Sequence, residues 1–123
     1  MQKDGKLQQA SLAFSIKLIH LYDRLEKKAF LKNQMARAAT AIGANIHEAE
    51  YAESVYDFVH KLKIALKECH ETEYWLKILG SAFPNLTDEA ELLRESAGRI
   101  RCMLIASIQK MNIRLNASSG ECH

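Results

Sequence analysis

Residues 57–79 read DFVHKLKIALKECHETEYWLKIL, and the spacing within this stretch decides the fold class. Apolar or small side chains recur there at alternating intervals of four and three residues, at Phe58, Leu62, Ala65, Cys69, Thr72, Leu76 and Leu79. This alternation places them on one face of an α-helix and is typical of helices that pack against other helices. We therefore predict a helix over about 55–80 whose core-facing side is this set, named here the 58–79 seam.

Three further segments repeat helical spacing, which predicts amphipathic helices over about 7–26, 34–50 and 87–115. Their apolar stripes are, in order, Leu7, Phe14, Leu18, Leu21 and Leu25; Met35, Ala38, Ile42, Ile46 and Ala49; and Leu93, Ala97, Ile100, Leu104, Ile108, Met111 and Leu115. Short connections favour antiparallel neighbours, so the predicted fold is all-α, an antiparallel up-down-up-down four-helix bundle. We expect residues 1–123 to form a single domain, with a core at about 7–115 and polar tails at 1–6 and 116–123.

The helix boundaries are predicted from residues with capping preferences. Asn33 is the expected N-cap of the second helix, and Thr87 that of the fourth. Ser54 followed by Asp57 resembles a capping box, with Asp in place of the usual Glu. Gly80 is the expected C-terminal stop of the third helix.

The composition indicates an intracellular protein. No run approaches the ~18 apolar residues of a membrane span, and the N-terminus, MQKDGKLQQ, lacks the apolar stretch of a signal peptide. Cys69, Cys102 and Cys122 are odd in number and form no CxxC pair, which fits a reducing compartment and small apolar fillers. We expect a cytoplasmic protein with no membrane association.

Charge is segregated along the chain, whose formal net charge is +2. Residues 1–37 hold eight Lys or Arg against three acids (net +5), residues 38–91 four against ten (net −6), and residues 92–123 five against two (net +3). Such segregation marks either a nucleic-acid surface or helices that pair acidic with basic neighbours.

The candidates for RNA contact are cations around the first connection and on the fourth helix. They are Arg24, Lys27, Lys28, Lys32, Arg99 and Arg101. Lys61, Lys63 and Lys67 also line part of the third helix. In one chain these cations fit an ordinary solvated surface, but a ring-shaped oligomer would repeat them around an axis and strengthen their field.

Two helices carry more apolar side chains than one core-facing stripe needs. The additional sets are Leu12, Ile16 and Ile19 on the first helix, and Ile64, Trp75 and Ile78 on the third. Isolated exposed apolar residues are common, but sets that recur at helical spacing mark a partner surface. We therefore predict a homo-oligomer whose interface includes these two sets.

No motif indicates catalysis or ligand binding. No Glu has a His three residues later, as a di-iron bundle requires, and His47-Glu48 begins HEAEY rather than the zinc pattern HExxH. The phosphate-binding patterns GxxxxGK[ST] and GxGxxG are absent from the sequence. We predict no catalytic residues, no metal ligands, no cofactor and no small-molecule substrate, and hence a protein that is not an enzyme.

Residues 40–50, TAIGANIHEAE, combine a core stripe with polar residues. Gly43 lies on a side of small residues, where another backbone can approach closely. Asn45 and Glu48 share a different ridge with Arg37, and each needs a partner from another helix or subunit. We predict that Arg37, Asn45 and Glu48 are structural polar contacts that set helix register.

The segment ARAATAIGANIHEA, followed by DFVHKLKIALKECHETEYWLKIL, resembles the family of four-helix bundle proteins, or 23S rRNA intervening-sequence proteins, over about residues 10–115. Accessory variability proteins of diversity-generating retroelements are related members. The matching positions are Arg37, Ile42, Asn45, Ile46, Glu48, Asp57, Phe58, Leu62, Ile64, Ala65, Glu68, Glu71, Thr72, Tyr74, Trp75 and Leu76. Ala41 departs from the family's usual Ser and loses a local hydrogen bond.

The resemblance implies a bundle that assembles as a homopentameric ring and has no enzymatic activity. Intervening-sequence members are encoded inside inserts in bacterial large-subunit rRNA genes, and the retroelement members bind reverse transcriptase and nucleic acid. Two interpretations stay open. The first is a non-enzymatic oligomer that binds RNA or a nucleoprotein partner, such as a reverse transcriptase complex. The alternative is an oligomeric protein-interaction scaffold without nucleic-acid contact.

Overall fold

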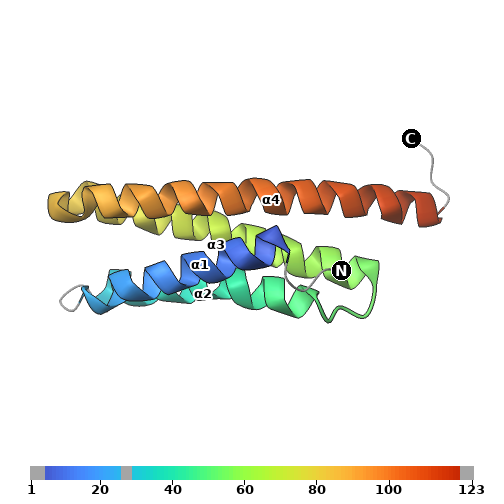
Figure 1. The fold of residues 1–123 in the computed structure, drawn as a ribbon, viewed down its shortest axis with the longest axis horizontal. Helices are drawn as coiled ribbons and strands as arrows, with labels where there is room; N and C mark the ends of the chain where they lie inside the picture. The colour runs from blue at the N-terminus through green and yellow to red at the C-terminus, as the bar shows by residue number, and fades with distance from the viewer. Residues whose placement is uncertain (1–4, 26–28, 120–123) are drawn as a thin grey trace.

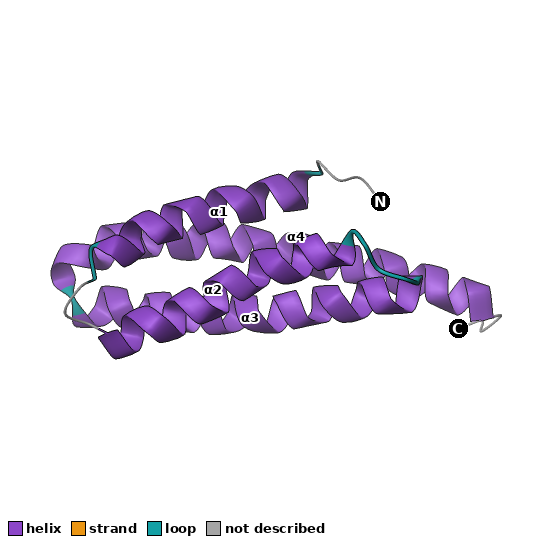
Figure 2. Cartoon of the chain, turned by 90° about the horizontal axis from the view of Figure 1, so that it is seen from below, coloured by secondary structure: helices purple, strands orange, loops and turns teal. Residues whose placement is uncertain are grey.

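The structure is a computed structural model that describes residues 5–25 and 29–119, and within them it contains four α-helices and no strand (Figure 1). The helices are α1 (Lys6–Asp23), α2 (Ala29–Ala49), α3 (Val55–Ala82) and α4 (Thr87–Ser119), and a 3-10 turn, η1 (Pro84–Leu86), precedes α4. Successive helices run in opposite directions. Both α1 and α3 pack against α2 and α4, as Figure 2 shows from a second side.

The 58–79 seam is the centre of the core. Its residues are buried from Leu62 to Leu79, while Phe58 at its start is half-buried and the neighbouring Val59 is buried instead. α3 makes its most extensive contacts with α2 and α4, and the seam faces both. Burial of each large aliphatic side chain stabilises the fold by about 1.5–3 kcal/mol, so the seam is a major source of stability.

The other predicted stripes are also confirmed. In α1, Leu7 is half-buried and the other four members are buried, and all five members of the α2 stripe are buried. In α4 the stripe is buried from Leu93 to Ile108, and Met111 and Leu115 pack partly buried against the core. The spacing therefore identified the inward side of every helix.

The start of α3 has the predicted capping box. The Ser54 Oγ accepts a hydrogen bond from the Asp57 backbone N–H at 3.0 Å. Asp57 reaches back in turn, and its Oδ2 accepts from the Glu53 backbone N–H at 3.2 Å. The first bond satisfies a donor that a helix N-terminus leaves without an intrahelical partner, and the second ties the residue before the N-cap to the first turn of α3.

The predicted start of the second helix is wrong. Asn33 lies inside α2, which is already helical at Ala29, and its Oδ1 accepts from the Tyr22 hydroxyl of α1 at 3.5 Å. Leu31 explains the longer helix, because it extends the apolar stripe four residues before Met35 and packs against the core.

Gly80 and Thr87 also have other roles than those predicted. α3 continues past Gly80 to Ala82, and a Cβ built on Gly80 would lie 3.2 Å from the Ala90 Cβ. Gly80 therefore permits close approach of α4. Thr87 is the first residue of α4, and its hydroxyl donates to the Gly80 carbonyl oxygen at 2.6 Å, so it links two helices instead of capping one.

The predicted C-terminal tail begins too early, because α4 stays helical through Ser119. Residues 116–119 contain neither Gly nor Pro, and extending an existing helix gains a hydrogen bond for each residue added. At the other end, Lys6 already belongs to α1, although the predicted tail includes it.

The cysteines differ in environment. Cys69 is a buried filler as predicted: its Sγ lies 3.2 Å from the Ala97 carbonyl oxygen, and burial raises the pKa of its thiol to about 12. Cys102 contradicts the prediction, because it lies exposed on the outward side of α4. Cys122 lies outside the described residues.

Alanine substitutions at two glycines test the helix contacts. At Gly43 a Cβ would lie 3.4 Å from the Ser15 Oγ of α1, an ordinary contact, so Gly43→Ala gains about 1 kcal/mol of helix propensity. At Gly80 the same gain is opposed by overpacking against Ala90, which costs about 1–3 kcal/mol. Chemical denaturation of both variants is expected to show Gly43→Ala as the more stable. The reverse order would contradict the close α3–α4 contact.

Candidate functional site

Arg37 of α2 forms the most connected polar site in the structure, because it pairs with two acids of α3. Its Nη1 lies 3.2 Å from the Glu68 Oε2, and its Nη2 pairs with the Glu71 Oε2. The two acids stand three residues apart, so both lie on the flank of α3 that faces α2. Arg37 was predicted to need a partner on another helix or subunit. That partner is a pair of acids on another helix of the same chain.

An aromatic cluster continues from this site. The Trp75 Nε1 donates to the Glu71 Oε2 at 3.0 Å, and the Trp75 ring meets Phe30 of α2 edge-on at a centroid distance of 6.1 Å. Tyr74 lies tilted against Trp75 at 5.6 Å. Phe30 is 73% exposed and Tyr74 59%, so the cluster presents aromatic rings to solvent.

The electrostatics of the site follow from these contacts. The Trp75 hydrogen bond has the largest effect and lowers the pKa of Glu71. Burial raises this pKa, and the hydrogen bond and charge of Arg37 lower it again, so that the net shift is downward. The hydrogen bond to Glu71, followed by the Glu71 charge, raises the pKa of Arg37. Both groups are therefore held ionised, and neither is poised to transfer a proton near neutral pH.

Glu48 and Asn45, the other two predicted structural polar residues, have partners of different kinds: Glu48 pairs with another helix and Asn45 with its own. The Glu48 Oε1 pairs with the Lys61 Nζ of α3 at 3.0 Å. The Asn45 Nδ2 donates at 2.9 Å to the Ala41 carbonyl oxygen of its own helix. Glu48 thus links α2 to α3, and the register role assigned to these residues stays a prediction.

Four of the six predicted RNA-contacting cations are engaged by neighbouring side chains. Arg24 of α1 pairs with Glu89 of α4, and the Arg101 Nε lies 2.8 Å from the Glu73 Oε1 of α3. The Lys32 Nζ lies 4.2 Å from the centroid of the Tyr22 ring, and the Arg99 Nη2 donates to the Ser96 Oγ at 3.1 Å. Lys27 and Lys28 lie outside the described residues.

The two predicted interface sets differ in exposure. Leu12, Ile16 and Ile19, named here the α1 ridge, are 63%, 48% and 50% exposed. Ile64, Trp75 and Ile78 on α3 are half-buried. Leu92 of α4 is also 66% exposed.

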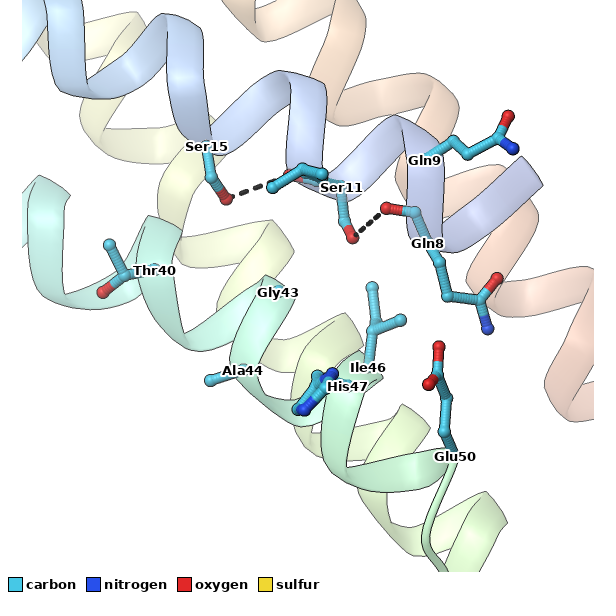
Figure 3. Close-up of a pocket in the computed structure, with 11 residues that line it drawn as sticks. Gln8, Gln9, Ser11, Ser15, Thr40, Gly43, Ala44, Ile46, His47 and Glu50 are labelled. Atoms are coloured by element: carbon cyan, nitrogen blue, oxygen red, sulfur yellow. Dashed lines mark hydrogen bonds between the residues drawn. The ribbon is translucent and has the colours of Figure 1, made fainter. Parts of the chain in front are cut away.

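A groove of about 560 Å³ runs between α1 and α2, beside the α1 ridge (Figure 3). Its hydroxyls are already used, because Ser11 donates to the Gln8 carbonyl oxygen at 3.1 Å and Ser15 to that of Ser11 at 2.9 Å. The remaining lining is small, apolar or polar: Gln9, Leu12, Thr40, Gly43, Ala44, Ile46, His47 and Glu50. This arrangement suits a packed helix better than a reacting substrate.

The described residues contain neither a cluster of metal-binding side chains nor a membrane-spanning helix. In residues 5–25 and 29–119, no three His, Cys, Asp or Glu side chains are grouped so that they could hold a metal ion. Over the same residues, no helix combines the length and the apolar character needed to cross a membrane.

The family model for the 23S rRNA-intervening sequence protein matches residues 3–106. The chain belongs to this family. A solved structure from the S23 ribosomal protein family, a protein of unknown function from Bacteroides thetaiotaomicron VPI-5482, is similar with a TM-score of 0.78 and 38% identity. That match covers 83% of this chain and 97% of the other. No curated protein matches the chain.

The sequence did not predict the place of Phe30 in the aromatic cluster. It also did not predict that Glu89 and Glu73 pair with Arg24 and Arg101. Phe30 was assigned to a connection, although the stripe residue Leu31 beside it was a signal that the helix begins earlier. Glu89 and Glu73 stand 65 and 28 residues from their arginine partners, and no local pattern predicts such pairs.

The lowered pKa of Glu71 predicts a pH dependence of stability. A carboxyl group with a lowered pKa stabilises the fold above its ordinary value of 4.5, and this contribution is lost as the pH falls through the lowered pKa. Thermal unfolding followed by circular dichroism should therefore show the wild type more stable than Glu71→Gln at pH 7. The difference should shrink as the pH falls below about 4. A difference independent of pH would contradict the ionised Glu71 site.

Proposed function

We propose that this protein is a non-enzymatic, self-assembling helical bundle of the bacterial cytoplasm that binds RNA or a nucleoprotein partner. The observation that carries the proposal is the exposed α1 ridge. Three large aliphatic side chains at i, i+4 and i+7 stand in solvent in the single chain. Burying each of them is worth about 1.5–3 kcal/mol, which favours a second copy of the chain as the occupant.

The apolar surfaces lie on different helices, which favours a ring. The α1 ridge is on one helix, whereas the Phe30–Trp75 pair lies across α2 and α3. Contact between two different surfaces is heterologous, and repeated heterologous contacts give a ring when the rotation between subunits closes and an open filament when it does not. The family resemblance favours five subunits.

Family membership supports RNA as the partner, and a ring would repeat each exposed cation around its axis. The ion pairs of Arg24 and Arg101 favour the alternative, an oligomeric scaffold without nucleic-acid contact, because they neutralise two of the expected RNA contacts. Binding of a labelled RNA at about 50 mM salt, weakening as salt rises, separates the two functions.

Self-assembly is tested by light scattering coupled to size-exclusion chromatography. Five copies of the 14.0 kDa chain give a complex of about 70 kDa (5 × 14.0). Ile16→Glu, which places a charge in the α1 ridge, is expected to reduce the mass to that of one chain while helicity is retained.

The matched control is Ile113→Glu on α4, which changes an isolated Ile that is 70% exposed and should leave the oligomer intact. A monomeric wild type at micromolar concentration would remove the assembly proposal.

A further inference from the structure

Seven exposed side chains follow one another along the outward face of α3. They are Tyr56, His60, Lys63, Lys67, His70, Tyr74 and Lys77, named here the outer stripe. Each stands two positions before a residue of the 58–79 seam, and two positions along an α-helix differ by about 200°. The seam faces the core, so the outer stripe faces away from it along its whole length, about 32 Å at 1.5 Å per residue.

The positive charge of the outer stripe is not compensated by the acids of α3. All four acids lie on the flanks and are engaged there: Asp57 with the Glu53 backbone N–H, Glu68 and Glu71 with Arg37, and Glu73 with Arg101. Lys67 is within electrostatic range of Glu71, whose carboxylate already binds Arg37 and Trp75. Among the described residues, no ion pair joins Lys63, Lys67 or Lys77 to an acid.

Aromatic rings stand within the same stripe. Tyr56 is 74% exposed near the start of α3, and Tyr74 is 59% exposed near the other end. Tyr74 is supported from behind by Trp75, which in turn contacts Phe30. Tyr74 is therefore held at the surface between His70 and Lys77, while Tyr56 stands exposed before His60 at the other end of the stripe.

Lysines that share one helix face with exposed aromatic rings suit one class of partner. Single-stranded nucleic acid offers phosphates to the cations and unstacked bases to the rings. An acidic protein surface would also satisfy the lysines, and a polyglutamate competitor distinguishes it from RNA. A rigid duplex offers phosphates, but its bases are stacked inside and unavailable to the rings.

We propose that the outer stripe of α3 binds single-stranded RNA, with Lys63, Lys67 and Lys77 on the phosphates and Tyr56 and Tyr74 stacked on bases. This assignment rests on the RNA binding proposed above. It places that binding on α3 and not on the cations of the first connection and α4.

The experiment measures fluorescence anisotropy of a labelled single-stranded RNA of mixed sequence with the purified full-length protein across a salt series. Lys63→Gln combined with Lys67→Gln should weaken binding roughly tenfold and reduce the slope of log affinity against log salt by about 1.4, or 0.7 per lost phosphate contact. Tyr56→Ala should also weaken binding roughly tenfold at constant charge.

The matched control combines Lys17→Gln on α1 with Lys110→Gln on α4. Both lysines are exposed and lie off the outer stripe, so the same loss of charge should leave binding nearly unchanged. Circular dichroism and oligomer mass confirm that each variant is folded and assembled.

The outcomes separate the two proposals. Absence of RNA binding by the wild type at about 50 mM salt overturns the proposed function, and this assignment with it. Wild-type binding that the α3 variants leave unchanged overturns the assignment alone. A third combination would identify the stripe as a site for acidic protein. In that case the lysine double variant weakens binding, Tyr56→Ala has no effect, and a polyglutamate peptide of equal charge displaces the RNA. This result would show that the RNA assignment is wrong.

Discussion

The bundle depends on the burial of one face of α3 between α2 and α4. Once the 58–79 seam faces the core, the flanks of α3 must meet its neighbours, and both flanks carry ion pairs: Glu68 and Glu71 with Arg37 of α2, and Glu73 with Arg101 of α4. The same constraint leaves the outer stripe in water, because it stands about 200° from the seam. The core-facing seam, the flanks that carry the ion pairs and the candidate RNA surface are thus different sides of α3.

The helices and their inward faces could be predicted from the sequence because long periodic stripes depend only on helix geometry. The boundaries were less predictable where tertiary contacts decide them. Gly80 has the residue type of a helix stop, yet it lies within α3 because Ala90 of α4 must approach it closely. Asn33 has a side chain suited to an N-cap, but Leu31 packs against the core. The helix therefore begins before Asn33, at Ala29.

The candidate site was harder to predict, because segment charge conceals the position of each charge. Residues 38–91 carry net −6, a total that does not indicate an RNA surface on α3, although the acids of α3 occupy its flanks and three of its four lysines the outward face. The sequence does contain a pattern that predicts this surface. The residues of the outer stripe recur at alternating intervals of four and three residues, each two positions before a residue of the 58–79 seam. Ion pairs between residues far apart in sequence, such as Arg24 with Glu89, become visible only in the fold.

Assembly and RNA binding use different surfaces in this scheme: the α1 ridge and the Phe30–Trp75 pair join subunits, and the outer stripes, which include Tyr74, repeat around the ring. Photochemical crosslinking of a 4-thiouridine RNA to the native protein, with the modified peptides mapped by mass spectrometry, tests the assignment of α3 most directly. Adducts on peptides that contain Tyr56 or Tyr74 are predicted. Adducts confined to the segment from Arg24 to Lys32 and to Arg99 and Arg101 would contradict it.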